Sequence, residues 1–436
     1  MATIVQKFGG SSMADAARIR HCAGRVAEAA RRGDKVVVVV SAMGDTTDDL
    51  LTLAGELAEN PNKRELDQLM ATGEQISIAL MSMALHGLGL EAVSLTGGQC
   101  GVKTDGAHTR ARIKDVDAAR MSAELGKGRI PVVAGFQGIT DGGEVTTLGR
   151  GGSDTTAVAL AAALKADVCE IYTDVDGVYT ADPRVVPHAR LKERISYDEM
   201  MEAASQGAKV MHLRAVELGK NRGVAIRVLH SMHHGPGTLI CESGDPMETQ
   251  QAVSTVALKT DIGRVTLAGL PNRPGLQKEI FTRIADARIS VDDIIQNELV
   301  GDEAGVKDAD GNPRCNIVFT VDKTDLADVK PIIEQVIKEF GGNGEGTMHV
   351  DLGLAKVSAV GVGMQSQPGV AARMFNALAE AGIRIANITT SEIKISCILE
   401  EGDGKQGLRV VHDAFGLGNP APPGAVETKV RRTLKK

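Results

Sequence analysis

The sequence contains no tryptophan, and only 2% of its 436 residues are aromatic. Proteins that bind single-stranded nucleic acids stack bases on aromatic side chains, so this composition disfavours such a role. The formal net charge of −7 also argues against a general nucleic-acid binder. No apolar run is long enough to cross a membrane, and no signal peptide precedes the first predicted strand. These absences predict a cytoplasmic protein without nucleic-acid or membrane partners.

The six cysteines are scattered along the chain, with no close pair among them. Zinc sites and disulfide frameworks need paired or regularly spaced cysteines, so neither is predicted. Free thiols in a reducing compartment are the expected state. His230, His233 and His234 lie close together without a partner cluster elsewhere, so we assign them no metal.

Hydrophobic residues make up 43% of the chain and charged residues 24%, which is typical of globular proteins. The length indicates two or three domains. In the first half, short apolar strands alternate with helical segments, and this order predicts βαβ units with a mostly parallel sheet. The predicted strands are 3–8, 35–40, 91–95, 130–135, 168–173 and 224–229, and the predicted helices include 13–32 and about 65–86.

Residues 147–156, with the sequence TLGRGGSDTT, form a glycine-rich turn that runs directly into a helix-forming stretch. Ser153 and Asp154 can begin such a helix, whose first N–H groups attract anions. Arg150 adds a planar guanidinium that suits a carboxylate or a phosphate. An ordinary capped turn explains the same residues equally well. A second glycine turn at the end of the first strand favours the anion site.

Polar turns follow three of the predicted strands, at 9–12, 41–47 and 174–184. Ligands of open parallel sheets bind at the carboxyl ends of the strands, so these turns are candidate binding elements. The third turn is acidic, and it fits either a solvated hairpin or a nucleotide-binding loop. It lacks the spacing and the closing glutamate of a calcium loop.

The C-terminal part contains an internal repeat. Pro368 lies 94 positions after Pro274, and the same offset relates several matched glycine and core positions. Each copy has the order strand, Pro-Gly turn, amphipathic helix and strand, which predicts a β-α-β-β-α-β unit. The charged stretch 301–315 is predicted to be an exposed loop, and 421–436 a disordered tail.

Four motifs occur in order: KFGGSS at 7–12, ATGE at 71–74, TLGRGGSD at 147–154 and YTDVDG at 172–177. Together they resemble the aspartate kinases, which have the amino-acid-kinase fold, and the resemblance covers roughly residues 2–418. The two repeats resemble paired ACT domains. The resemblance implies an α/β catalytic domain with three αβα layers and a mostly parallel open sheet, followed by two α+β ferredoxin-like ACT units.

The resemblance also implies domain limits. A kinase domain would cover 1–245, and 246–264 would be a linker whose strand-like run 253–259 pairs with the second ACT unit. The ACT units would cover 265–345 and 346–420, ahead of the tail at 421–436.

By the same resemblance, the expected activity is the phosphorylation of the L-aspartate β-carboxylate by MgATP to 4-phospho-L-aspartate. This is the first step toward lysine, threonine and methionine, and it is expected to be feedback-regulated through the ACT units. The alternative is a non-catalytic ACT amino-acid sensor. A sensor would be expected to have lost Lys7 or Asp154, and both are present.

The implied roles fall into three groups. The expected catalytic residues are Lys7, Asp154 and Lys209. The expected aspartate-binding residues are Ser41, Thr47, Glu74, Arg150, Gly151, Gly152 and Ser153. The expected nucleotide-binding residues are Lys7, Gly9, Gly10, Thr173, Asp174, Tyr179, Asp182, Arg184, Lys209 and Val210. Mg²⁺ is expected to be held mainly through the ATP phosphates, so no protein ligand is assigned.

An amino-acid effector, lysine or threonine or both, is expected to bind where two ACT units pair. Pairing of sheet edges between chains would also give a homodimer or a higher oligomer. The expected effector residues are Asn272, Arg273, Pro274, Gly275, Asp292 and Gln296 in the first unit, with Gln365, Gly369, Val370, Asn387 and Ile388 in the second. For Asp292 and Asn387, an ordinary exposed strand position is the competing explanation.

Overall fold

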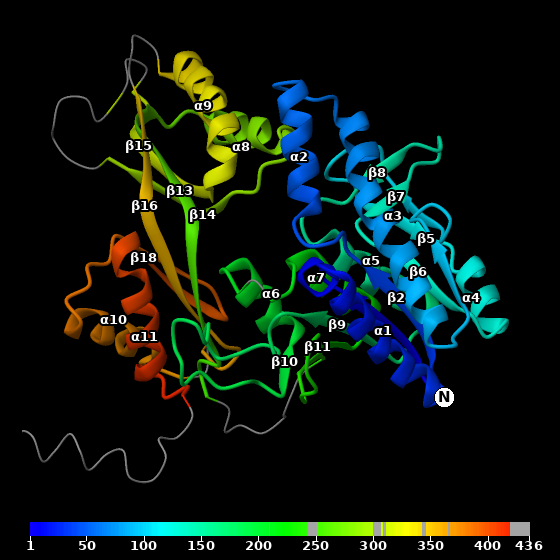
Figure 1. Cartoon of the computed structure of the whole chain (residues 1–436). Coiled ribbons are helices and arrows are strands. Elements are labelled where there is room, and N and C mark those ends of the chain that lie inside the picture. Colours follow the sequence, from blue (N-terminus) through cyan, green and yellow to red (C-terminus); the bar gives the residue numbers. More distant parts are fainter. Residues whose placement is uncertain are drawn as a thin grey trace, which may run out of the picture. The chain divides into compact units, whose positions relative to one another are not determined.

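The computed structural model describes residues 1–208, 210–242, 251–299, 307, 311–341, 346–364 and 367–418. These residues form two compact units (Figure 1). Of the described residues, the first unit contains those of Met1–Pro183 and His188–Gln251 together with Gly418, and the second contains those of Arg184–Pro187 and Ala252–Leu417. A search of the described residues finds no helix with the length and apolar character that a bilayer crossing requires.

An eight-stranded sheet forms the centre of the first unit, in the order β10-β12-β11-β9-β1-β2-β6-β3. All neighbouring strands are parallel except β11 and β12, so the predicted parallel sheet is confirmed. The strands are β1 Thr3–Phe8, β2 Lys35–Val40, β3 Ala92–Leu95, β6 Ile130–Ala134, β9 Val168–Thr173, β10 Arg194–Ser196, β11 Ile226–His230 and β12 Thr238–Cys241.

Helices cover both faces of this sheet because its central strands are apolar on both sides. In β2, Val36, Val38 and Val40 pack in the core that contains residues of α1 and α3. Val37 and Val39 pack in a second core that contains residues of α5, α6 and α7. This arrangement gives the three predicted layers. The helices are α1 Ala16–Arg31, α2 Thr46–Leu57, α3 Lys63–Gly87, α4 Ala119–Gly126, α5 Gly152–Leu164, α6 Tyr197–Ser205 and α7 Leu213–Arg222, with a 3-10 turn η1 at Gly10–Met13.

A smaller four-stranded sheet in the order β5-β4-β7-β8 carries the glycine-rich stretch. Its strands are β4 Val102–Thr104, β5 Ile113–Val116, β7 Gln137–Ile139 and β8 Val145–Thr147. The stretch that begins at Thr147 therefore leaves a strand and enters α5 at Gly152. Ten residues of α5, from Gly152 to Ala161, are buried, so this helix is enclosed on all sides, with polar residues in its first turn and apolar residues after them.

One continuous sheet of six strands, in the order β14-β15-β13-β16-β18-β17, forms the second unit. The repeat is visible in its turns, because Gly275 and Gly369 begin α8 and α10 with φ angles of 101° and 89°. Glycine adopts this left-handed conformation without strain. The elements are β13 Thr255–Pro271, α8 Leu276–Asp286, β14 Asp292–Glu298, β15 Arg314–Asp322, α9 Leu326–Phe340, β16 Thr347–Val360, α10 Val370–Glu380, β17 Asn387–Thr390, β18 Lys394–Glu400 and α11 Gly404–Ala414, with 3-10 turns η2 Lys323–Asp325 and η3 Glu401–Asp403.

The long strands β13 and β16 serve both repeats. The start of β13, Thr255–Lys259, pairs with the end of β16, so the predicted pairing of this run with the second repeat is found. The predicted loop 301–315 is wrong at its C-terminal end, because Arg314 and Cys315 begin β15 and Cys315 is fully buried. The predicted tail 421–436 and the first five residues of the predicted linker, 246–250, lie outside the described residues, while the rest of that linker is described and enters β13 at Thr255.

Candidate active site

Three turns meet at the carboxyl ends of the adjacent strands β9, β1 and β2. The Gly9 N–H donates to the Tyr172 carbonyl at 3.2 Å, and the Ser41 N–H donates to the Phe8 carbonyl at 3.1 Å. The Gly44 N–H donates to the Gly10 carbonyl at 3.0 Å. These bonds fix the first and second glycine-containing turns against each other, as a shared binding edge requires.

Gly10 is a glycine because backbone approaches it closely. A Cβ at this position would lie 3.0 Å from the Gly44 carbonyl oxygen and 3.2 Å from that of Ala42. At Gly9, a Cβ would lie 3.4 Å from the Lys7 Nζ. The turn therefore keeps its backbone N–H groups close to a cation, which suits an anionic ligand.

A buried ion pair joins this turn to the glycine-rich stretch. The Lys7 Nζ on β1 lies 2.6 Å from the Asp154 Oδ1 in the first turn of α5. Their side chains are 11% and 12% exposed, so both charges are largely withdrawn from water. The sequence predicts these two residues in one site, and the structure brings them together from positions far apart in the chain.

Glu74 lies on α3 and reaches the turn after β2. Its Oε1 accepts a hydrogen bond from the Ala42 N–H at 3.0 Å, and Gly73 allows α3 to approach Ala42. Burial raises the pKa of the Glu74 carboxyl to about 7. Among the described residues, its Oε2 has no hydrogen-bond partner. A buried, unpartnered carboxylate oxygen can accept a bond from a ligand ammonium group.

We expect the binding of a cationic amine group here to weaken as the pH falls through about 7. Protonation of Glu74 removes the charge that attracts the ammonium, so kcat/KM for an amino-acid substrate should fall about tenfold per pH unit below that value. Glu74→Gln should lower kcat/KM about 10- to 100-fold at pH 8 and abolish this pH dependence. Steady-state kinetics between pH 5.5 and 8.5 measures both effects.

The control for this prediction is Glu65→Gln, an exposed carboxylate on the same helix. It should keep the wild-type pH profile. An unchanged profile in Glu74→Gln would assign the titration to another group.

Gly151 and Ser153 are held tightly in the glycine-rich stretch. Gly151 has a φ of 68°, and a Cβ there would lie 2.1 Å from the His212 Cβ. Ser153 is buried against Gly135, which follows β6. Arg150 is exposed beside them, so its guanidinium is available to a ligand. Gly152 begins α5, while Ser41 and Thr47 are half-buried at the end of β2 and the start of α2.

Two residues outside the sequence motifs hold this stretch in place. The Arg214 guanidinium donates to the Leu148 carbonyl at 2.6 Å and to the Ala111 carbonyl at 3.0 Å. The carboxylate of Asp67, fully buried on α3, accepts a bond from the Thr147 hydroxyl at 2.5 Å. A single arginine or aspartate without a surrounding motif gives no sequence signal, so only the fold reveals these contacts.

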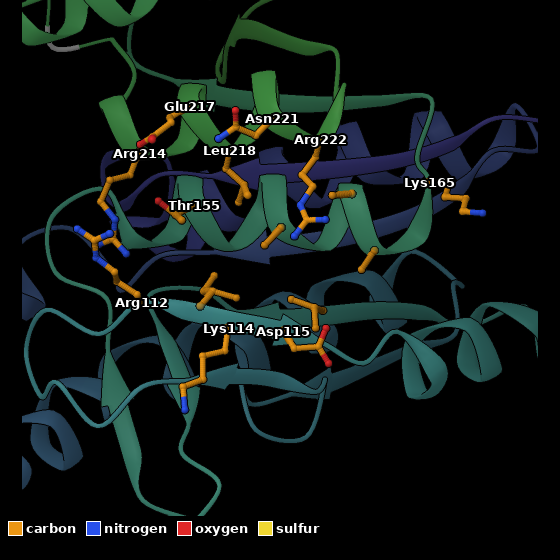
Figure 2. Close-up of a pocket in the computed structure, with 15 residues that line it drawn as sticks. Arg112, Lys114, Asp115, Thr155, Lys165, Arg214, Glu217, Leu218, Asn221 and Arg222 are labelled. Atoms are coloured by element: carbon orange, nitrogen blue, oxygen red, sulfur yellow. The ribbon is translucent and has the colours of Figure 1, made fainter.

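Arg214 also lines a groove of about 570 Å³ between β5, α5 and α7. Figure 2 shows Arg214 and Arg112 near one another at one end, with Arg222 and Lys165 farther along. Lys165 and Arg222 lie at the C-terminal ends of α5 and α7, where cations are favoured by the helix dipole. Because Lys165, Arg214 and Arg222 have structural explanations, we assign no ligand to this groove.

The predicted nucleotide residues of the third turn lie beyond β9. The Thr173 hydroxyl donates to the Asp174 Oδ1 at 3.2 Å, and the Tyr179 hydroxyl donates to the Asp176 Oδ2 at 2.9 Å. Asp182 is half-buried in the same segment.

Arg184, Lys209 and Val210 are the other residues predicted to bind the nucleotide. Val210 packs against the core of the first unit. Arg184 belongs to the short segment that groups with the second unit, and Lys209 lies outside the described residues.

In the second unit, the predicted effector residues lie at the start of α8 and along β14. Asn272 and Gln296 share Gln277, whose Nε2 donates to the Asn272 Oδ1 at 3.0 Å and to the Gln296 Oε1 at 2.9 Å. Arg273, Pro274 and Gly275 form the turn into α8. The Asp292 Oδ2 accepts a bond from the Lys356 Nζ at 2.6 Å.

In the second repeat, Gly369 and Val370 begin α10, and Asn387 and Ile388 begin β17. The Asn387 Oδ1 accepts a bond from the Ile388 N–H at 2.8 Å. Gln365 lies outside the described residues. Gly275 and Gly369 thus occupy equivalent positions before α8 and α10 in the two repeats.

Comparison with known proteins agrees with this fold. Residues 2–230 match the amino acid kinase family, and residues 357–415 match an ACT domain. The chain is 48% identical to an aspartokinase from Pseudomonas aeruginosa, over 97% of this chain and 100% of that relative.

Two solved structures of E. coli aspartokinase III resemble the whole chain. One is a complex with aspartate and ADP in the R-state, with a TM-score of 0.77 and 25% identity, and it covers 94% of this chain and 99% of that chain. The other is a complex with lysine and aspartate in the T-state, with a TM-score of 0.70 and 26% identity. The match covers 95% of this chain and 99% of that chain. The chain therefore belongs to the amino acid kinase family and, within it, to the aspartokinases.

Proposed function

We propose that this protein transfers the γ-phosphoryl group of ATP to the β-carboxylate of L-aspartate and forms 4-phospho-L-aspartate. The observation that carries the proposal is the buried Lys7–Asp154 pair at the edge where the glycine turns meet. The similarity to aspartokinases, one of which was solved with aspartate and ADP, supports the choice of substrates.

The reaction needs no general base, because the aspartate carboxylate is ionised near pH 7. A carboxylate oxygen attacks the γ-phosphorus, and the bond to the bridging oxygen of ADP breaks. Catalysis then consists of positioning and neutralisation of charge on the transferred group. Lys7 supplies a cation and the Gly10 N–H group supplies a donor, while Gly9 lets the backbone approach the Lys7 ammonium and Asp154 holds that ammonium in place.

The two ends of aspartate are assigned to different side chains. The Arg150 guanidinium matches the α-carboxylate by its planar fork, and Glu74 accepts the ammonium. Ser41, Thr47 and Ser153 offer hydroxyl groups, and Gly151 and Gly152 leave room for the substrate at the start of α5.

ATP is assigned to the turn after β9, with Thr173, Asp174, Tyr179 and Asp182 along it and Arg184, Lys209 and Val210 as further predicted contacts. Mg²⁺ prefers oxygen ligands and keeps several waters, so we assign it mainly to the ATP phosphates. The exposed carboxylate of Asp174 is an oxygen donor of the kind that this ion accepts. When bound, the ion would neutralise phosphate charge.

We further propose that both repeats are ACT domains and that an amino-acid effector binds at the turns before α8 and α10. Lysine is the first candidate, since one similar aspartokinase was solved with lysine in a T-state. Threonine is the second. Pairing of these units between two chains would give a homodimer or a higher oligomer.

The substrate assignment is tested by incubating the enzyme with MgATP, hydroxylamine and either L-aspartate or L-glutamate. An acyl phosphate reacts with hydroxylamine to give a hydroxamate, and we expect this product from aspartate. Product from glutamate alone would refute the substrate, and the lack of any product would favour the amino-acid sensor.

The regulatory assignment is tested by thermal shift and by rate with lysine, threonine and methionine, alone and in pairs. An effector that binds the folded state raises the melting temperature by mass action. If no amino acid changes either the melting temperature or the rate, the regulatory proposal fails.

A further inference from the structure

Asp67 is a carboxylate with no exposed surface, located on α3 two helical turns before Glu74. A buried ionised carboxylate is costly unless donors surround it. Both of its oxygens have such donors, and all of them come from one region of the first unit.

The donors belong to the loop before β5 and to the end of β8. The Thr147 hydroxyl donates to Oδ1 at 2.5 Å, and the Thr109 N–H is 3.0 Å from Oδ1 and 3.1 Å from Oδ2. The His108 Nδ1 is 2.8 Å from Oδ2. Asp67 thus connects three segments that are separated by about 40 residues or more along the chain.

The loop that Asp67 binds, at 108–111, in turn contacts the glycine-rich stretch. The Ala111 N–H donates to the Thr147 carbonyl at 2.9 Å, and a Cβ at Gly149 would lie 3.1 Å from the Thr109 carbonyl oxygen. Thr109 has a φ of 68°, which is strained for a β-branched residue. A strained backbone conformation persists only where the surrounding contacts hold it in place, and such conformations are concentrated at functional sites.

We propose that Asp67 is a positioning residue for the aspartate-binding stretch, acting through Thr147 and the 108–109 backbone on Arg150 and Ser153. This inference rests on the proposed function, because it assigns the stretch to aspartate. Arg150 is exposed and is three residues beyond Thr147, so its position depends on the turn that carries it. Asp67 fixes the start of that turn, and Arg214 fixes the Leu148 carbonyl.

The negative charge of Asp67 is essential to this role. An asparagine has the same shape, but its amide nitrogen is a donor and would face a group that donates to the carboxylate, such as the Thr109 N–H. A carboxylate accepts from all of its neighbours at once. We therefore expect Asp67→Asn to weaken the contacts that hold both the 108–109 loop and the turn after Thr147.

The experiment compares KM for aspartate with KM for ATP in Asp67→Asn, Thr147→Val and Thr147→Ser. Thr147→Val removes only the hydroxyl donor, and Thr147→Ser retains it. We expect KM for aspartate to rise about tenfold in the first two variants, with KM for ATP within about twofold of wild type, which is the effect of one lost hydrogen bond to a charged group. Thr147→Ser should remain close to wild type, and Asp141→Asn, an exposed carboxylate, is the matched control.

The double variant Asp67→Asn/Thr147→Val should show less than the product of the single effects, because both changes remove the same contact. Amide hydrogen exchange without substrate should be faster at 147–151 in both single variants and unchanged in β1 and β2. An unchanged KM for aspartate in folded Thr147→Val, or a parallel rise in both KM values, would overturn the role of Asp67. A wild-type enzyme that does not phosphorylate aspartate would instead refute the proposed function.

Discussion

Replacing Lys7 by methionine is expected to lower kcat by about two to three orders of magnitude, which is the usual effect of removing one preorganised donor from a transition state. Lys7 is held 2.6 Å from Asp154, so its ammonium is oriented before the reaction begins. Charge develops on the transferred phosphoryl oxygens, and the fixed cation stabilises that charge more than it stabilises the ground state. Steady-state kinetics with saturating aspartate and MgATP measures the loss.

Loss of Lys7 also leaves Asp154 as an unpaired buried carboxylate, which can destabilise the fold. The double variant Lys7→Met/Asp154→Asn removes both charges and should be folded but still inactive. Lys35→Met replaces an exposed lysine at the start of the neighbouring strand and should keep wild-type activity. Folded Lys7→Met with near-normal kcat would remove this residue from the mechanism.

The second large effect is expected in the second unit, at Lys356 on β16. Its side chain is 1% exposed, and its Nζ lies 2.6 Å from the Asp292 Oδ2 and 2.9 Å from the Asp293 Oδ2. Burial alone would lower the pKa of Lys356, but the attraction of Asp293 and Asp292 outweighs it and raises that pKa. Asp293 also accepts a bond from the Thr389 hydroxyl at 2.9 Å, so the cluster joins the two repeats.

Lys356→Met is expected to reduce the stability of this unit by about 3–5 kcal/mol, because it leaves the buried carboxylate of Asp293 without a cation. Amide hydrogen exchange of the β13 and β16 peptides localises the effect to this unit. Lys278→Met, an exposed lysine on α8, is the control. Lys356→Met/Asp293→Asn should recover much of the loss. If Lys356→Met exchanges as slowly as wild type, the ion cluster does not stabilise the sheet.

The parts of the fold that are predictable from sequence are those with strong local patterns. The five valines of β2 predict a strand buried on both faces, and alternate valines do pack in two different cores. The offset between the repeats predicts equivalent turns, and Gly275 and Gly369 adopt the same left-handed conformation. In both cases the residues that decide the structure are neighbours in sequence.

Elements without such a pattern are not predictable in this way. Helix α2 has leucines, but Leu51, Leu53 and Leu57 are exposed, so they form no buried stripe that would indicate a helix. The strands β10 and β12 have three and four residues and mixed polarity, and they exist because they pair with each other and because β12 pairs with β11. Tertiary pairing of this kind leaves no local signal.

The same distinction applies to the site. Lys7, Glu74, Arg150 and Asp154 lie in the motifs that resemble the aspartate kinases, so that resemblance indicates them as site residues. Asp67 and Arg214 have no motif, and their partners are distant in sequence: Ala111 is 103 positions from Arg214, and Thr147 is 80 positions from Asp67. Supporting contacts of this kind depend on the packing of the whole unit.

The most direct test of the proposed reaction is to identify which carbon of aspartate receives the phosphoryl group. The enzyme is incubated with MgATP and aspartate labelled with ¹³C at either the α- or the β-carboxyl carbon, and the product is observed by ¹³C and ³¹P NMR. We predict phosphorus coupling and a shifted carboxyl signal from the β-labelled substrate alone. Coupling to the α-labelled carbon, or no aspartate-dependent acyl phosphate, would contradict the assignment of Arg150 and Glu74 to the other end of the substrate and of Lys7 to phosphoryl transfer.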